Sequence, residues 1–433
     1  MMTKQALLVC VVVLALAACP NDTTPGGGHT HEWGAWTQTA VEGTEERVCR
    51  TDQAHTETRL TGTGRFGFTL IGNTAYRVRK GTAVSGEVHI PTYYRPSATG
   101  EYLPVTIIDD NAFEYCQNLT GITIPASVTS IGSHAFRSCI SLASITVDAG
   151  NPNYTSENGI LYNKAKTTLI RAPGAISGNV TIPTGVTSIG DSAFSGCHLL
   201  YSISIPASVT SIGPDAFAGC TSLESISIPA GVTYIGAFAF DDCSSLESIT
   251  IPASVTSIVT DAFFGCTSLT RITVDWGNPN YASEGGILYN KAKTTIVAYP
   301  SASGDVTISA GVTRINANVF MVRTSLTSIT LPAGMTSIGG WAFDGCTNLA
   351  RITLPASVTS IGADAFSRCT SLASITIPAS VTVVGDSAFN GWRSNQTIYV
   401  EGHANATAAD TAWNSPYTSW RSGCGATIVY QGR

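Results

Sequence analysis

The chain has 433 residues, of which 43% are hydrophobic and only 12% charged, and its formal net charge is −6. An acidic chain that lacks a basic stripe is poorly suited to nucleic acid, so that class of partner is excluded. A charge content well below the usual ~25% indicates an exterior made of small neutral residues such as Ser, Thr, Gly and Asn.

Residues 1–18 have the layout of an export signal. Lys4 precedes an apolar run from Ala6 to Ala18, which is too short to span a bilayer. The run ends in Leu-Ala-Ala-Cys, which resembles a bacterial lipobox, and the resemblance implies lipidation of Cys19 and a membrane anchor. Residues 19–28, rich in Pro, Gly and Thr, are then a tether. The alternative is an ordinary secretory signal in which Cys19 is incidental.

A short polar segment, residues 29–62, resembles small His/Trp/Cys modules that precede repeat regions in some bacterial surface proteins. Its candidate zinc ligands are His29, His31, Cys49 and His55. Asp52 stands where the second thiol of a Cys-x-x-Cys pair belongs, so we expect a degenerate spacer without metal. Residues 63–104 follow as an irregular N-terminal cap, because a stacked array must cover its first apolar face.

From residue 105 to residue 394 a 23-residue phrase recurs: VTSIG, then AF, then Cys, then SL and SITIP. Its phenylalanine returns ten times: Phe113, Phe136, Phe194, Phe217, Phe240, Phe263, Phe320, Phe343, Phe366 and Phe389. A fixed period of this length predicts one supersecondary unit per repeat, stacked into a solenoid. The spacing stretches to 58 and 57 residues at two similar insertions, each predicted to contain a hairpin around Asn-Lys-Ala-Lys.

Within one repeat, the alternation in Leu223–Ile228 predicts a strand, which Pro229 ends because proline cannot donate to a ladder. Val209 and Ile212 begin the return side, Gly213 permits a tight turn, and Phe217 starts a short helical turn. The fold class is therefore a right-handed, β-dominated solenoid with a parallel sheet, short return strands and short helical turns. Residues 395–433 lose the repeat and are predicted to be a C-terminal cap of two strands and a helix.

The phrase L-x-x-I-x-I-P-x-x-V-x-x-I-G-x-x-A-F-x-x-C resembles the bacterial BspA-like class of leucine-rich repeat. The resemblance covers about two-thirds of the chain and implies a leucine-rich-repeat solenoid at the bacterial surface. It also implies attachment to host extracellular-matrix proteins or to other cells, with no cofactor. The coil around Phe320 departs most from the pattern, since Arg323 occupies the cysteine position.

The recurring polar residues favour structural roles over catalysis. Eight cysteines share one phase, but side chains in register on parallel coils do not converge, so we expect buried free thiols rather than disulfides. Asp191, Asp215, Asp261 and Asp364 precede the AF pair and are expected to cap the backbone N–H groups of the helical turn. The histidines share no phase, so no nucleophile, base and acid come together, and the chain is not expected to be an enzyme.

The outward positions of the strands are the candidate binding surface. They carry columns of hydroxyl groups, joined by two arginines that would anchor a partner: Thr123, Thr146, Ser204, Ser227, Thr250, Thr273, Arg271, Thr330, Arg351, Thr353 and Thr376. Threonine also favours pleated surfaces for its own sake, so a purely structural column is the alternative. We therefore expect a non-catalytic surface lipoprotein, exported and anchored in the outer membrane. A scaffolding lipoprotein that faces the periplasm is the alternative.

Overall fold

The computed structural model describes residues 66–81, 84–95, 102–259, 261–300, 302–413 and 418–432. Ahead of these it describes only the backbones of β1 (Thr37–Gln38), β2 (Thr44–Val48) and β3 (Thr56–Leu60), which pair antiparallel. The predictions for Cys19, for the 19–28 tether and for zinc at His29, His31, Cys49 and His55 lie outside the described residues. No helix in the described part is both long and apolar enough to cross a membrane.

The chain forms two compact units that divide after Lys166. In the first unit, β4 and β5 form an antiparallel hairpin, and β5 continues into parallel pairing with β8. The strands of this unit are β4 (Phe66–Ile71), β5 (Ala75–Lys80), β6 (Gly86–His89), β7 (Tyr93–Tyr94), β8 (Leu103–Ile108), β9 (Leu119–Ile124), β10 (Ser130–Ile131), β11 (Ser144–Val147), β12 (Tyr154–Glu157) and β13 (Ile160–Asn163).

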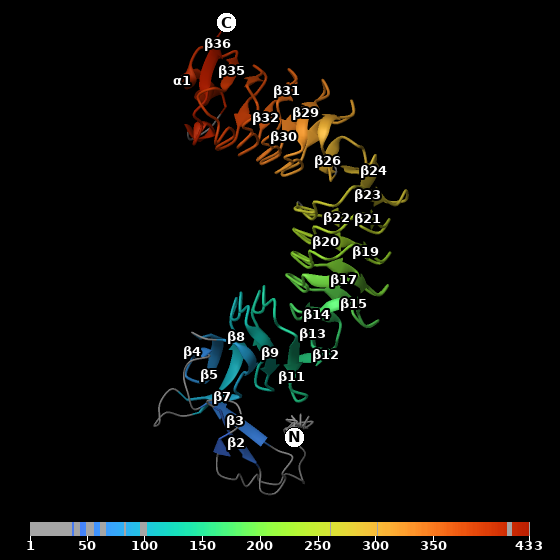
Figure 1. Ribbon diagram of the computed structural model, residues 1–433, viewed down its shortest axis with the longest axis vertical. Helices are drawn as coiled ribbons and strands as arrows, with labels where there is room; N and C mark the ends of the chain where they lie inside the picture. The colour runs from blue at the N-terminus through green and yellow to red at the C-terminus, as the bar shows by residue number, and fades with distance from the viewer. Residues whose placement is uncertain are drawn as a thin grey trace, which may run out of the picture. The chain divides into compact units, whose positions relative to one another are not determined.

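The second unit stacks its coils through two kinds of parallel ladder, as Figure 1 shows. The longer strands make the main sheets: β15 (Ser177–Thr181), β17 (Leu199–Ser204), β19 (Ser225–Ser227), β21 (Ser248–Ile251), β23 (Arg271–Val274), β27 (Gly304–Thr307), β29 (Leu326–Thr330), β31 (Arg351–Ile352) and β33 (Ser374–Ile377). Two-residue strands make most of the return side: β14 (Thr168–Arg171), β16 (Ser188–Ile189), β18 (Ser211–Ile212), β20 (Tyr234–Ile235), β22 (Ser257–Ile258), β28 (Arg314–Ile315), β30 (Ser337–Ile338), β32 (Ser360–Ile361) and β34 (Val383–Val384). This is the solenoid that the repeat predicted.

The second insertion is a three-stranded antiparallel unit rather than a single hairpin. It consists of β24 (Tyr281–Glu284), β25 (Ile287–Asn290) and β26 (Thr295–Ala298). The predicted hairpin is β25–β26, and the sequence missed β24 because its Tyr-Ala-Ser-Glu has little apolar content. Strand β26 then pairs parallel with β28, so the insertion ends as the return strand of a coil.

The core between the two sides is a column of phenylalanines. Phe194, Phe217 and Phe240 are fully buried, and their rings stack nearly parallel with centroids 5.2 and 5.4 Å apart. Phe320, Phe343 and Phe366 repeat this arrangement at 5.1 and 5.3 Å. Because each ring buries a large apolar area against the next coil, the stack supplies much of the driving force for folding.

The helical turn predicted at each AF pair is wrong. In this segment the backbone makes consecutive turns, and the N–H of Phe217 donates to the carbonyl of Ala239 in the next coil at 2.8 Å. The residue before each AF pair has a positive φ, for example 52° at both Asp215 and Asp364. The aspartates therefore recur because Asp and Asn tolerate the left-handed conformation, and the expected helix caps are absent from these turns. Asp110, two residues before its AF pair, has a related role, since its carboxylate accepts from the N–H of Ser133 in the next coil at 2.7 Å.

The glycine that closes the return strand is needed for close approach between coils. A Cβ at Gly236 would lie 2.4 Å from the backbone nitrogen of Pro214. At Gly236 the two backbones thus pass too closely for a side chain, although Val259 and Asn316 occupy the same position in two other coils.

The chain ends on β35 (Thr397–Glu401), α1 (Ala406–Ala412), the 3₁₀ turn η1 (Thr418–Arg421) and β36 (Thr427–Gln431). Two strands and a helix were predicted for residues 395–433, and all three are present. Trp413 and Trp420 are buried beneath them, and the Trp420 ring meets Phe389, the last phenylalanine of the column.

Candidate binding surface

The outward residues of the main sheets align into columns, as the sequence predicted. In β19 the exposed, buried, exposed pattern of Ser225, Ile226 and Ser227 shows the alternation directly. Register pairing carries the two exposed positions from coil to coil, joining Ser225 to Ser248 and Ser227 to Thr250. The candidate residues Ser204, Ser227, Thr250, Thr273, Arg271, Thr330, Arg351, Thr353 and Thr376 are all exposed in the second unit. In the first unit Thr146 is exposed and Thr123, its register partner, is half-buried.

The columns extend beyond the residues that the repeat identified. Glu87 and His89 of β6 pair with Gly121 and Thr123, and Asp305 of β27 pairs with Ser328. Sequence reasoning therefore missed two acidic residues and treated Arg271 and Arg351 as the only charges of the columns. The alternation in Asp305-Val306-Thr307 was the available signal, but no AF pair precedes this strand at the usual distance.

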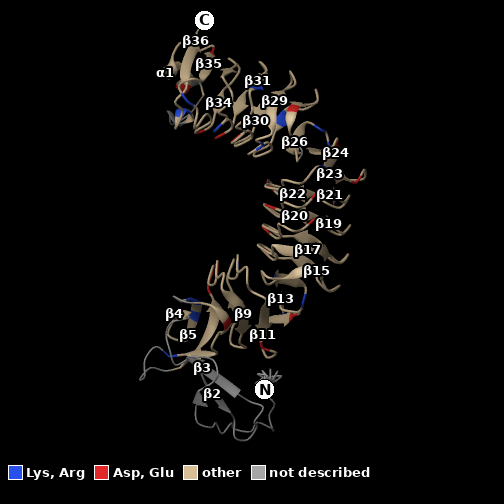
Figure 2. Cartoon of the chain, viewed as in Figure 1, with Lys and Arg blue, Asp and Glu red and all other residues tan. Residues whose placement is uncertain are grey.

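Asp305 is held in place by two hydroxyl groups of the next coil. Thr327 donates to its carboxylate at 2.9 Å and Ser328 at 2.5 Å. Both hydrogen bonds, the one from Ser328 first, lower the pKa of Asp305, and the positive charge of Arg351 adds to the effect. The face thus carries one ordered acid close to one basic anchor, in a surface where charges are otherwise sparse (Figure 2).

An exposed aromatic residue follows the strand that carries Arg271. Trp276 follows β23 at the start of the second insertion with 95% of its surface accessible, although Trp is highly buried on average. Ala149 holds the same place in the first insertion. Trp and Arg are enriched among the residues that supply binding energy at protein interfaces, so Arg271 at the start of β23 and Trp276 just after its end are the strongest candidate anchors of this surface.

The cysteines do not form a reactive site. All eight repeat cysteines are buried and free, which confirms that part of the sequence prediction. Burial raises the pKa of the Cys197 thiol to about 11 and that of Cys266 to about 12. Each thiol from Cys220 to Cys266 donates instead to the phenylalanine carbonyl of the preceding coil, at 3.0–3.2 Å. Among the described residues, no three His, Cys, Asp or Glu side chains lie close enough to hold a metal ion.

The chain is a leucine-rich-repeat solenoid. Apart from the two insertions, its coils repeat every 23 residues, and each stacks a strand, a return strand and a buried AF pair on the next. The family described as BspA type leucine rich repeat region matches it in six copies, over residues 106–177, 175–280 and 299–413. The chain belongs to this family, as its sequence resemblance indicated.

Among solved structures, a leucine rich cell surface protein from Faecalibacterium prausnitzii A2-165 is similar to this chain. It is 29% identical with a TM-score of 0.55, and the match covers 86% of this chain and 94% of that one. The pneumococcal vaccine antigen PcpA is 18% identical with a TM-score of 0.46, covering 91% and 98% of the two chains. A leucine-rich repeat protein from Bacteroides ovatus ATCC 8483 is 23% identical with a TM-score of 0.30, covering 85% and 99%. No curated protein matches the chain.

Proposed function

We propose that the protein is a non-catalytic, lipid-anchored protein of the bacterial surface that binds other proteins through its exposed sheet face. The observation that carries the proposal is the surface around β23, where Arg271 stands exposed in a column of hydroxyl groups and Trp276, two residues after the strand, is exposed as well. A rigid, hydrogen-bonding face with a few large anchors is the form that solenoid binding surfaces take. The similar Faecalibacterium protein is described as a cell surface protein, which supports the location.

The proposed partners are proteins of the host extracellular matrix or of other cell surfaces. The test uses the chain from residue 63 onward, without its anchor, on immobilised fibronectin and fibrinogen. We expect saturable binding, with Trp276→Ala and Arg271→Ser each weakening it about ten-fold or more, because truncating such an anchor costs about 2 kcal/mol.

Arg314→Ser is the matched control, since Arg314 is an exposed arginine on the return side. Its binding should equal that of the unchanged chain. Absence of saturable binding to any matrix protein or partner cell, or equal losses in the control, would contradict the proposal.

Location and anchoring are tested separately. Protease added to intact cells should remove the repeats if the protein faces outward, whereas full protection would support the alternative of a periplasmic scaffold. Replacement of Cys19 by Ser should abolish incorporation of radiolabelled palmitate and release the protein from membranes. Continued labelling of that variant would contradict lipidation at Cys19.

A further inference from the structure

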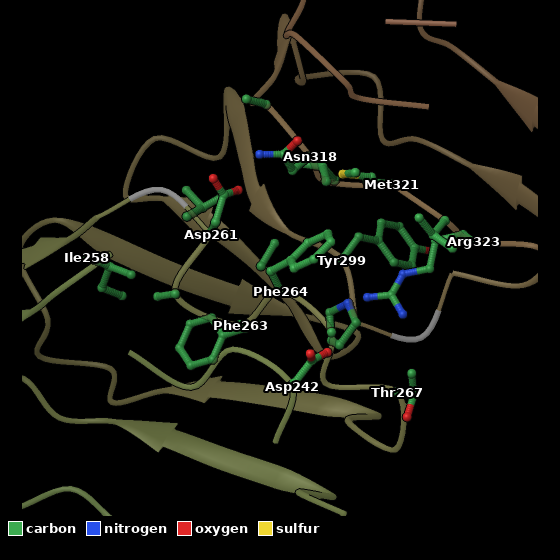
Figure 3. A pocket seen from close by; sticks show the side chains of 18 of the residues that line it. Asp242, Ile258, Asp261, Phe263, Phe264, Thr267, Tyr299, Asn318, Met321 and Arg323 are labelled. Carbon is green, nitrogen blue, oxygen red and sulfur yellow. The ribbon is translucent and has the colours of Figure 1, made fainter. Parts of the chain in front are cut away.

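A pocket of about 240 Å³ lies where the second insertion rejoins the stack (Figure 3). It opens between the coil of Phe263 and the coil of Phe320, with Tyr299 of the insertion as part of its wall. Phe263, Phe264, Tyr299 and Met321 make most of this lining apolar. The volume exceeds the roughly 150 Å³ of a cavity that holds one benzene ring, and it falls below that of pockets for drug-sized ligands.

Among the described residues that line the pocket, the one basic side chain is Arg323, which stands at the cysteine position of its coil. Its Nε is buried without a hydrogen-bond partner, and no hydrogen bond or ion pair joins its guanidinium group to a described residue. Burial lowers the pKa of Arg323 from its usual value, which reflects the cost of keeping an unpaired cation away from water. Figure 3 shows the side chain extended into the pocket.

The first insertion provides an internal comparison. There Arg171 follows the same Thr-Thr-apolar-apolar sequence, and its guanidinium donates to the backbone carbonyls of Ser192 and of Ser195, the latter at 2.7 Å. The corresponding residue of the second insertion is Ala298, which has no charge. The arginine near this insertion is instead Arg323 of the following coil. The first arginine is therefore committed to protein carbonyls, whereas the second faces an open space.

Two carboxylates also line the pocket and limit the charge of the ligands that it can bind. Asp261 is hydrogen-bonded by Asn318, and Asp242 is exposed at another edge of the pocket. These acids disfavour ligands with several negative charges, and they leave room for a ligand that carries one ammonium group besides its carboxylate. Nothing in this arrangement offers a second cation for a phosphate.

We propose that this pocket binds a small monocarboxylate with an apolar body of about one aromatic ring. The carboxylate would take the free guanidinium in a bidentate, charge-assisted pair, and the ring would pack among Phe263, Phe264 and Tyr299. Such a ligand can be a free aromatic amino acid or the carboxyl-terminal residue of a peptide, since both present the same chemistry. The pocket is separate from the protein-binding face and does not depend on it.

The proposal is tested by calorimetry on the purified protein with four probes: phenylalanine, N-acetylphenylalanine, 3-phenylpropionate and phenethylamine. We expect 3-phenylpropionate to bind and phenethylamine, which lacks the carboxylate, to bind at least ten-fold more weakly. Binding by phenylalanine alone of the two amino-acid probes would identify a free amino acid as the source. Binding by N-acetylphenylalanine alone would identify a peptide carboxyl terminus.

Arg323→Cys is the decisive variant, because cysteine holds this position in eight of the nine other coils and should fold there without loss of stability. We expect Arg323→Cys to weaken the binding of 3-phenylpropionate at least ten-fold. The control Arg393→Cys, at an exposed arginine elsewhere, should leave the affinity unchanged. Equal binding of phenethylamine, unchanged affinity in Arg323→Cys, or no binding by any of the acids would overturn the proposal.

Discussion

At the cysteine position of successive coils, a side chain donates a hydrogen bond to the phenylalanine carbonyl of the preceding coil. The donor is usually a cysteine, but another residue type can replace it. Cys369 donates its thiol to the carbonyl of Phe343 at 3.1 Å. In the last coil Trp392 takes the cysteine position and donates its ring N–H to the carbonyl of Phe366 at 2.8 Å. In these coils the position is therefore filled by a buried group that packs between the two sides and supplies one donor, whereas Arg323 at the same position makes no such bond.

Asp241 makes stability depend on pH. Burial, with the nearby charges of Asp242 and Asp215, raises its pKa to about 6, and one of its oxygens is buried without a partner. Between its unfolded pKa of 3.8 and about 6, the folded state binds a proton that the unfolded state has lost, so stability falls as the pH rises through this window. We expect Asp241→Asn to raise the free energy of unfolding at pH 7.5 by about 1–2 kcal/mol, after allowing for solvent screening. Urea denaturation of the unchanged protein and of Asp241→Asn at pH 4.5 and 7.5 measures the pH dependence of stability and the effect of the substitution.

Asp305→Asn is the matched comparison, because the pKa of Asp305 is lowered by its hydroxyl donors. Its carboxylate stabilises the folded state above the unfolded pKa, so this variant should lose stability at pH 7.5. A loss of stability in Asp241→Asn at that pH would show that the carboxylate has a partner in solution.

Each coil contains two residues in the left-handed conformation, one before its alanine and one two residues after its phenylalanine. The second of these positions is held by Tyr115, Ser138, Gly196, Gly219, Asp242, Gly265, Val322, Gly345, Arg368 and Gly391. Glycine adopts this conformation without strain, whereas a β-branched residue does so at the largest cost. Packing between coils therefore holds the non-glycine residues of this position in a left-handed conformation that is unfavourable for them.

Val322 is the residue least suited to this position, at a φ of 56°. Because its side chain is 52% exposed, little burial is lost on its removal. We expect Val322→Gly to raise the free energy of unfolding by about 0.5–1 kcal/mol, since the relief of strain exceeds the entropic cost of glycine. Chemical denaturation compares it with Gly219→Val, which makes the opposite change at a φ of 72° and should destabilise the protein. Equal stability of all three proteins would mean that this turn relaxes around its side chain.

Sequence periodicity predicted the coil, its strands and its buried rings. It could do so because the buried positions of each coil are apolar and recur at a fixed spacing along the chain. It did not predict the AF turn correctly, since Asp215-Ala216-Phe217 suits a helical turn equally well and only the hydrogen bonds to the next coil decide against one. The binding columns were predicted where AF pairs mark the register and were missed at Glu87 and Asp305. The period identified Arg323 only as a departure at the cysteine position, and it could reveal neither the pocket that Arg323 lines nor the exposure of Trp276.

At the scale of the stack, the last coil presents an apolar end that the terminal segment covers. Trp413 and Trp420 pack edge to face at 4.9 Å, and Trp420 meets the ring of Phe389 at 6.1 Å. Asp410 fixes this cover by accepting from the Trp420 ring nitrogen at 2.8 Å and by pairing with Arg421 at 2.6 Å. Strand β36 then closes the edge of the sheet by pairing along all of β35.

Deletion of residues 403–433 should therefore convert the end of the stack into a self-association surface. It would expose Phe389 and the ladder edge of β35, and an apolar face with unpaired strand groups recruits another chain. We expect the shortened protein to sediment as larger species than the full-length protein at micromolar concentration and to unfold at a lower temperature. Arg421→Ala, which keeps β36 and both tryptophans, should lower the unfolding temperature without changing the sedimentation. A shortened chain that matched the full-length protein in both measurements would mean that the final coil is stable without a cover.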